Sequence, residues 1–182
     1  MRSFFRSSRP DPAGDPALHL SLEALERGLA SLPMAPRDRG RIVLIVARRD
    51  GGVRETPVRV TLTTDEGVPG DAWGRDPSRD PEGQLAVMQD DVAALVANSQ
   101  PLTLFGDNLF LTLDLSSENL PTGSRVRAGS ATLEVTPLPH DGCRKFRSRF
   151  GQAALRFVAR KDRLQRNLRG IYFPPGYRPI NY

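Results

Sequence analysis

The 182-residue chain contains a single cysteine, Cys143, and this scarcity excludes one class of protein. One thiol cannot form an intramolecular disulfide, so the chain is not a secreted scaffold held together by disulfide bonds. A lone thiol also persists most easily in a reducing compartment, and we therefore expect a cytoplasmic protein. No apolar run approaches the roughly 20 residues that a membrane helix requires, so we expect no membrane span.

Lysine is scarce as well, because Lys145 and Lys161 are the only lysines among 26 cationic residues. The stretch from His140 to residue 182 holds eleven of these cations against two acids, whereas the preceding residues carry a net negative charge. A concentrated positive field attracts the phosphate of a nucleic acid or of a small cofactor. Only 7% of the residues are aromatic and no nucleic-acid-binding motif is present, which argues against nucleic acid as the partner.

The N-terminal part differs in composition from the rest. Residues 1–36 are rich in proline, and one short helical pattern lies within them, built on Leu18, Leu22, Leu25 and Leu29. Ser21 is the candidate cap of this helix. We interpret the segment as an arm that either lies on the main domain or is poorly ordered. Residues 37–182 then form one domain of ordinary size.

Short apolar runs separated by turns dominate the main domain. Two pairs of runs favour antiparallel hairpins, residues 42–47 with 57–64 and residues 124–127 with 131–136. Residues 84–98 begin as a strand and continue as a helix that ends near Asn98. About five to seven short strands with two inserted helices predict a mainly β fold, a largely antiparallel β-barrel.

Residues 138–151 hold the only cysteine, one of the two histidines and the densest run of positive charge. Apolar residues recur there at a spacing of three to four, as Phe146 and Phe150 do, which predicts a helix that begins just after Cys143 and runs to about residue 161. Asp141 is placed to cap this helix.

The start of this helix favours a reactive thiol. Arg144 and Lys145 follow Cys143 directly, and both cations and the helix dipole stabilise the thiolate relative to the thiol. The thiolate is the form that attacks sulfur or binds a soft metal. Cys143 is therefore the first candidate for chemistry in this chain.

The residues alone leave other roles open for Cys143. Most lone cysteines are buried, small apolar residues. The spacing Cys143-x5-Arg149 also occurs in cysteine-dependent phosphatases, but the intervening residues contain no glycine and the phenylalanine spacing indicates a helix. His140 and Cys143 lie too close in sequence to be a typical cysteine-hydrolase pair, because such pairs normally come together from distant segments, with a third group that orients the base. Structural zinc would need four ligands, which the histidines and this cysteine cannot supply.

Several segments together resemble one known family. They are His140-x-Gly-Cys-x-Lys-Phe-x-x-Arg-Phe-Gly151, Leu168-Arg-Gly-Ile-Tyr172, and the turns Gly70-Asp71 and Gly106-Asp107-Asn108. In this order, across residues 37–173, the chain resembles stand-alone, bacterial-type members of the MOSC family, named for the C-terminal domain of molybdenum cofactor sulfurases. Agreement over several segments is more specific than any single motif.

The resemblance implies a MOSC-type β-barrel that binds the molybdenum cofactor, a molybdopterin. Carried across, Cys143 is the metal ligand or the carrier of a persulfide, and His140 belongs to the same catalytic motif. The cleft would also be lined by the turn residues Asp71, Asp107 and Asn108. The candidates for the pterin phosphate, chosen by charge and position, are Arg144, Lys145, Arg149 and Arg169.

The resemblance also implies partners. Family members suggest reduction of N-hydroxylated compounds, with electrons from a separate flavin or iron–sulfur protein. As a persulfide carrier, the chain would instead receive sulfur from a desulfurase, because we expect no pyridoxal-phosphate site within it. The family pattern usually continues past Tyr172 into a closing strand, whereas residues 174–182 include three prolines, so we also consider a barrel without its last strand that serves as a non-catalytic binding module.

Overall fold

The computed structural model describes residues 12–160 and 167–173. Its helices are α1 (Leu22–Ser31), α2 (Ala72–Arg75), α3 (Asp90–Ala97) and α4 (Arg144–Val158), with short 3₁₀ turns at Pro16–Leu18, Asp50–Gly52, Pro81–Gly83 and Leu102–Leu104. Its strands are β1 (Ile42–Ile45), β2 (Ala47–Arg48), β3 (Arg54–Glu55), β4 (Leu85–Gln89), β5 (Leu109–Leu111), β6 (Arg125–Ala128), β7 (Ala131–Val135) and β8 (Asn167–Phe173). No helix in the described ranges is long and apolar enough to cross a membrane.

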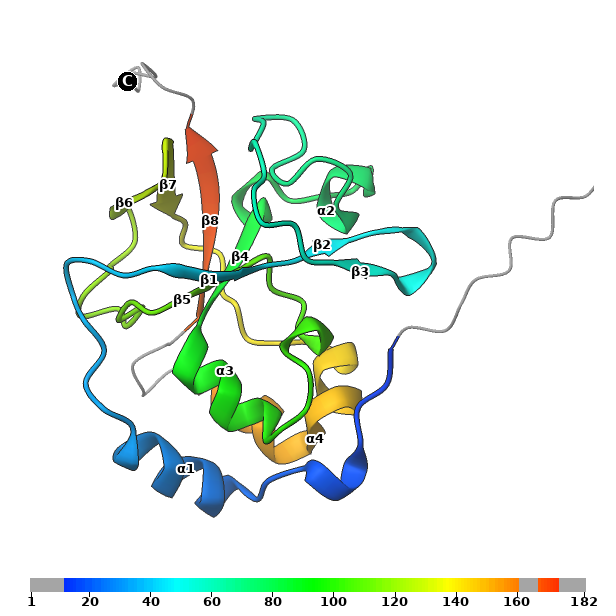
Figure 1. Ribbon diagram of the computed structural model, residues 1–182, viewed down its shortest axis with the longest axis vertical. Coiled ribbons are helices and arrows are strands. Elements are labelled where there is room, and N and C mark those ends of the chain that lie inside the picture. The colour runs from blue at the N-terminus through cyan, green and yellow to red at the C-terminus, as the bar shows by residue number, and fades with distance from the viewer. Residues whose placement is uncertain (1–11, 161–166, 174–182) are drawn as a thin grey trace, which may run out of the picture.

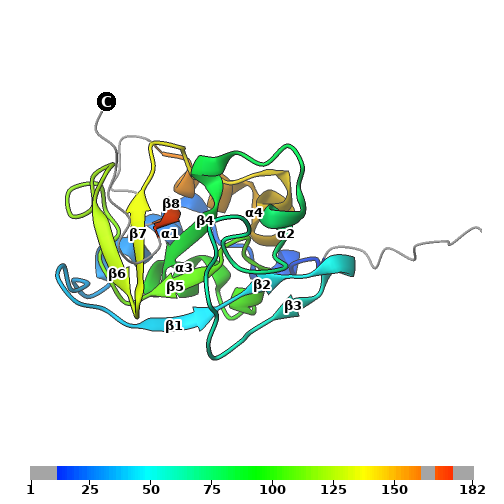
Figure 2. The same cartoon turned by 90° about the horizontal axis from the view of Figure 1, so that it is seen from above.

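Six strands form one curled, mixed sheet in the order β1-β5-β4-β8-β7-β6. Only β4 and β5 are parallel, while the other neighbours are antiparallel. The strands β2 and β3 form a separate hairpin that extends away from the large sheet (Figure 1). The fold is therefore rich in β structure with a few helices, and the large sheet curls into a half-barrel whose two edge strands are β1 and β6 (Figure 2).

The helices α1, α3 and α4 gather at one end of the molecule, below the sheet in Figure 1. They enclose an apolar cluster in which Leu25 of α1, Val92 of α3 and Phe150 of α4 are almost fully buried. A fully buried leucine contributes about 2 kcal/mol of hydrophobic stabilisation. Because Leu25 belongs to this core, the segment before residue 37 packs as part of the domain from residue 12 onward.

Several local predictions are confirmed. Ser21 caps α1, since its Oγ accepts a hydrogen bond of 3.1 Å from the amide of Ala24. The segment 84–98 forms β4 and then α3, which ends at Asn98 with a left-handed backbone (φ 44°). The hairpin of β6 and β7 and the helix start just after Cys143 are present as well.

Other local predictions are wrong. The hairpin around Asp50-Gly51-Gly52 pairs β2 with β3 at Arg54–Glu55, and residues 57–64 form no second arm. Pro57 has no amide to donate, and although Val60 and Leu62 pack inward, no strand of the described residues pairs with them in a ladder of hydrogen bonds. The helix α4 ends at Val158 rather than near residue 161, and it is interrupted at Gly151, whose φ of 90° is not helical.

Candidate functional site

Cys143 opens onto a cleft of about 330 Å³ between the β2–β3 hairpin, the Gly106-Asp107 turn and the start of α4. We call it the thiol cleft. Six cations and two carboxylates line it together with His140 and Cys143: Arg48, Arg49, Arg54, Arg75, Lys145, Arg149, Asp50 and Asp107. The segments that contribute them are far apart in the sequence. The fold therefore brings the only thiol of the chain into a cationic cleft.

Cys143 is exposed and is itself the N-cap residue of α4, with an extended backbone (φ −145°). The helix begins at Arg144, so Asp141 lies two positions before the cap, and the prediction that it caps the helix is wrong. Gly142 has a left-handed φ of 77°, and a Cβ there would lie 2.7 Å from Cδ1 of Leu155. This glycine lets the chain turn between His140 and Cys143 while it stays close to α4.

His140 and Asp107 meet at the wall of the thiol cleft. The Nδ1 atom of His140 lies 3.5 Å from Oδ1 of Asp107, and the two side chains are only 11% and 4% exposed. Asp107 comes from the turn before β5, a distant segment. A carboxylate at this distance balances the charge of a protonated imidazole ring. The structure thus places beside His140 a carboxylate from a distant segment, a contact that the sequence alone does not assign.

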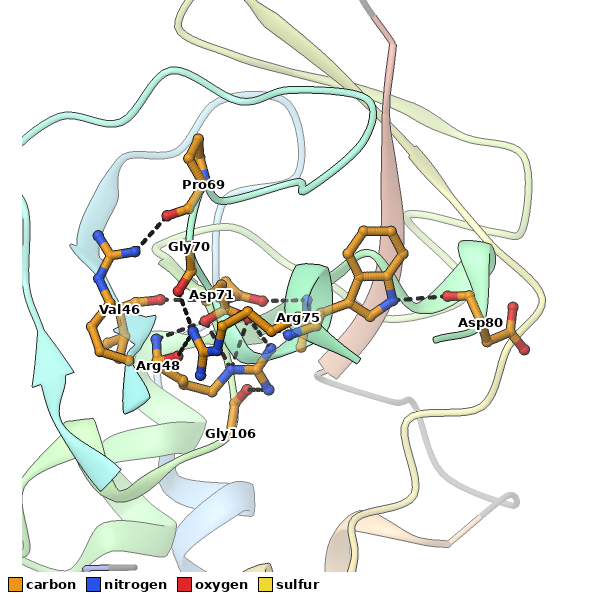
Figure 3. Close-up of polar contacts among 12 residues, drawn as sticks. Val46, Arg48, Pro69, Gly70, Asp71, Arg75, Asp80 and Gly106 are labelled. Carbon is orange, nitrogen blue, oxygen red and sulfur yellow. Dashed lines mark hydrogen bonds and ion pairs between the residues drawn. The ribbon is translucent and has the colours of Figure 1, made fainter. Parts of the chain in front are cut away.

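Arg48, which lines the cleft, forms an ion pair with the buried Asp71 (Figure 3). Asp71 is 1% exposed, and both of its oxygens accept hydrogen bonds from the Arg48 guanidinium. The Arg48 amide donates to the same carboxylate at 2.7 Å, and Arg48 Nη1 donates to the Gly106 carbonyl at 2.8 Å. Arg48 therefore joins the β2–β3 hairpin to both turns that carry the family resemblance.

The pKa of Asp71 reflects two opposing effects. Burial raises the pKa of the carboxyl, but the hydrogen bonds and the positive charge of Arg48, with smaller contributions from backbone amides, outweigh it and hold the pKa below the ordinary value. Asp71 also caps the short α2 by accepting a hydrogen bond of 3.1 Å from the Trp73 amide. It is therefore an ionised anchor of the cleft wall.

The other predicted turn residues divide between the lining and its support. Asp107 lines the cleft, whereas Asp71 and Asn108 lie behind it. The Asn108 amide group donates to the Val46 carbonyl at 3.2 Å and accepts from the Ala86 amide at 3.2 Å. Asn108 thus links Val46, between β1 and β2, to β4, and its role in this geometry is to position the turn.

The predicted phosphate ligands are dispersed. Lys145 and Arg149 line the cleft, while Arg144 is exposed outside it. Arg149 is only 3% exposed, and its guanidinium donates to the carbonyls of Pro12 (3.1 Å) and Leu104 (2.8 Å). The backbone of Arg169 pairs with Ala86 across β8 and β4, but its side chain lies outside the described part of the structure.

Four cleft arginines belong to segments that the sequence did not mark as functional: Arg48, Arg49, Arg54 and Arg75. Arg49 contacts Glu55 at 2.6 Å, and Arg75 contacts Asp50 at 3.3 Å. The signal that could have found the first three is the pattern Arg-Arg-Asp-Gly-Gly-Val-Arg of residues 48–54, because a tight turn flanked by arginines collects positive charge at one point, whereas Arg75 lies outside this pattern.

This arrangement suits an anionic ligand that places a soft atom near a thiol. Within residues 12–160 and 167–173, no group of three His, Cys, Asp or Glu side chains could hold a metal ion, so a metal here would need to arrive with ligands of its own. The fit to a small ligand is adequate, since the cleft volume lies at the lower end of the usual 300–1,000 Å³ range. Comparison with protein-family models, curated proteins and solved structures finds no match to this chain.

Proposed function

We propose that the thiol cleft binds the molybdenum cofactor, with Cys143 as the protein ligand of the metal, and that the protein reduces N-hydroxylated compounds. One observation carries the proposal: the only thiol of the chain shares a cleft with six cations and with the His140–Asp107 pair. The sequence resemblance to the MOSC family supports the same assignment, and with it the interpretation of the curled sheet as a MOSC-type barrel. Cytoplasmic location remains part of this proposal.

The donor chemistry of the cleft fits the cofactor. A pterin dithiolene brings two sulfur ligands to its molybdenum, so the protein needs to add only one, and a thiolate suits this thiophilic metal. The pterin carries a phosphate, which Lys145 and the exposed edges of the cleft arginines attract. A metal that arrives with ligands of its own does not need a cluster of three ligating side chains, and none is present among the described residues.

The proposed reaction converts a hydroxylamine, R–NHOH, into an amine. The N–O bond breaks, the oxygen leaves as water, and two protons and two electrons are consumed. The bound cofactor would carry out the transfer of oxygen and electrons at the cleft. The electrons themselves would come from a separate flavin or iron–sulfur protein. In this reaction His140 donates a proton at the cleft, and Asp107 orients its ring and stabilises the charged form.

Elemental mass spectrometry and pterin fluorescence on the purified protein test the proposal. Wild type and Cys143→Ala are purified from a host that makes the cofactor. We expect near-stoichiometric molybdenum and pterin in wild type, with the molybdenum largely lost from the variant. Asp141→Ala is the matched control, because this exposed residue lies two positions away and does not line the cleft. Wild type without pterin, from a host that loads other molybdenum enzymes, contradicts the proposal.

A second candidate function is a persulfide carrier, which the exposure of Cys143 favours. The Cys143 thiolate would attack the outer sulfur of a desulfurase persulfide, form a new S–S bond and release the desulfurase thiolate. An exposed thiol is accessible to a large partner protein. Incubation with a desulfurase and cysteine should then add about 32 Da, one sulfur atom, in a form that a reductant removes. If neither metal nor this adduct appears, the barrel is a non-catalytic binding module.

A further inference from the structure

A second concave surface runs between the two edges of the large sheet. One part, of about 990 Å³, lies between residues 37–42, at the start of β1, and residues 125–129 of β6 and its turn. The other part, of about 520 Å³, continues from Ile42 and Ala128 along residues 58–62. We call the two parts together the edge groove. It shares no lining residue with the thiol cleft.

The edge groove is bounded by strands that lack a second neighbour. Within the described residues, β1 pairs only with β5, and β6 pairs only with β7. An edge strand has a free row of amides and carbonyls that can pair with an added strand. Ile42 of β1 is 40% exposed, and the groove floor is apolar, formed by Leu111, Leu113, Leu120 and Val126. The surface has both the hydrogen-bonding edges and the apolar floor that an extended peptide needs.

The charge of the edge groove is strongly positive. Five arginines and one acid, Asp38, line its larger part: Arg37, Arg39, Arg41, Arg125 and Arg127. Arg37 and Arg125 contact Asp114 and Glu134. By contrast, Arg39 and Arg127, and Arg59 in the smaller part, are exposed and have no ion pair or side-chain hydrogen bond within residues 12–160 and 167–173. Unpaired arginines beside an apolar floor favour a ligand that carries carboxylates.

We propose that the edge groove binds an acidic, extended segment of a partner protein, which adds a strand to β1 or β6. In a strand, successive side chains point to opposite faces, so a segment that alternates apolar and acidic residues would face the leucine floor with one set and the arginine rim with the other. This proposal concerns a protein partner and does not depend on the function proposed for the thiol cleft.

Charge favours a partner protein, and not either end of this chain, as the occupant of the edge groove. Residues 174–182 contain Arg178, no acid and three prolines, and residues 1–11 contain three arginines against Asp11 alone. Both segments repel an arginine-lined groove, and proline cannot donate to a strand ladder. An acidic segment, in contrast, gains both attraction at the rim and burial of its apolar side chains.

Fluorescence anisotropy with labelled peptides tests the proposal on the full-length protein. The first probe is an eight-residue peptide of alternating valine and glutamate, and the second replaces glutamate with lysine. We expect the acidic peptide to bind and the basic one not to bind, with affinity falling as salt is added. We also expect N-methylation of alternate peptide amides to abolish binding, because it removes the donors of a strand ladder.

Variants locate the binding surface. Arg39→Glu with Arg127→Glu should weaken the acidic peptide by about tenfold or more, whereas Arg156→Glu, an exposed arginine on α4, should leave it unchanged. Equal binding of both peptides, equal effects of the two sets of substitutions, or no binding would overturn the proposal. So would light scattering that shows a dimer of the free protein that the double variant converts to a monomer, because a second copy would then occupy the groove.

Discussion

The thiol cleft and the edge groove are both rich in arginine, but they hold their arginines differently. In the thiol cleft, Arg48 is fixed by a buried carboxylate and a backbone carbonyl, and Arg149 by two carbonyls. In the edge groove, Arg39 and Arg127 are exposed, and the described residues give them no ion pair. Similar composition thus produces one preorganised surface and one adaptable surface.

The difference suits two kinds of ligand. A small rigid ligand gains most from charges that are already in place, since no side chain must be ordered when it binds. A peptide brings its own flexibility and gains from rim charges that attract it and adjust to it. The two sets of arginines also differ in their contribution to folding stability. The fixed arginines hold the segments of the thiol cleft together, whereas the exposed Arg39 and Arg127 contribute little.

The largest expected effect comes from Asp71→Asn, which removes the charge that fixes Arg48 and retains an oxygen to cap α2. A partly buried guanidinium then loses its counter-ion, and we expect the free energy of unfolding to fall by about 2 to 3 kcal/mol. Urea denaturation followed by circular dichroism measures it. The matched control is Asp50→Asn, which breaks the exposed contact with Arg75 and should change stability by less than about 0.5 kcal/mol. Equal losses would mean that the cleft is not built on the Arg48–Asp71 pair.

Acid should remove the stabilisation that the Arg48–Asp71 ion pair provides. Because the folded-state pKa of Asp71 is lowered, the stability that the pair provides is complete above the ordinary pKa of about 4 and is lost as the pH falls through the folded-state value. The difference in unfolding free energy between wild type and Asp71→Asn should therefore be constant from pH 5 to 7 and shrink below about pH 4.

The difference between the pH dependences of the unfolding free energy of wild type and of Asp71→Asn isolates the contribution of Asp71 from those of other carboxyl groups. Hydrogen bonds from Ser78 lower the pKa of Asp76, and burial raises that of Asp90, but both effects are present in wild type and in the variant. A difference that persists unchanged to pH 2 would show that Asp71 contributes through its shape and not through its charge.

A smaller effect is expected on the reactivity of Cys143, which reports the positive electrostatic potential of the thiol cleft. Cys143 is the only thiol, so its reaction rates with dianionic 5,5′-dithiobis(2-nitrobenzoate) and with neutral iodoacetamide are directly comparable. We expect Lys145→Gln to lower the ratio of these rates by about threefold, because it removes one cation from the lining. Lys145→Arg should retain the ratio, and so should Arg127→Gln in the edge groove. An unchanged ratio in Lys145→Gln contradicts a cationic cleft around this thiol.

Local structure was predictable from the sequence where it depends on residues that are close together in the chain. The start of α1 follows from the capping residue Ser21, and the strand-to-helix segment 84–98 and the helix start after Cys143 follow from the spacing of apolar residues. The failed hairpin arm at residues 57–64 shows the limit, because alternation indicates which side chains point inward but does not provide a neighbouring strand. The break at Gly151 lies against His19 of the N-terminal segment, since a Cβ there would come within 2.9 Å of His19 Nδ1, and periodicity cannot detect such a contact.

The site was predictable in the same uneven way. Contiguous spacing singled out His140, Cys143 and Lys145, and all three line one cleft. The contact of Asp107 with His140 and that of Asp71 with Arg48 join distant segments, so only the fold could reveal them. The arginines of the edge groove carry no motif, and they become visible only when the curled sheet brings β1 and β6 to one surface.

The smallest expected effect completes the contrast. Arg39→Glu with Arg127→Glu should change the free energy of unfolding by less than about 0.5 kcal/mol, because neither exposed guanidinium has a partner among the described residues to lose. The same urea titration used for Asp71→Asn measures it, and the reagent ratio at Cys143 should also stay at its wild-type value. A loss near that of Asp71→Asn would mean that these arginines stabilise the fold, and the edge groove would then resemble the thiol cleft in its architecture.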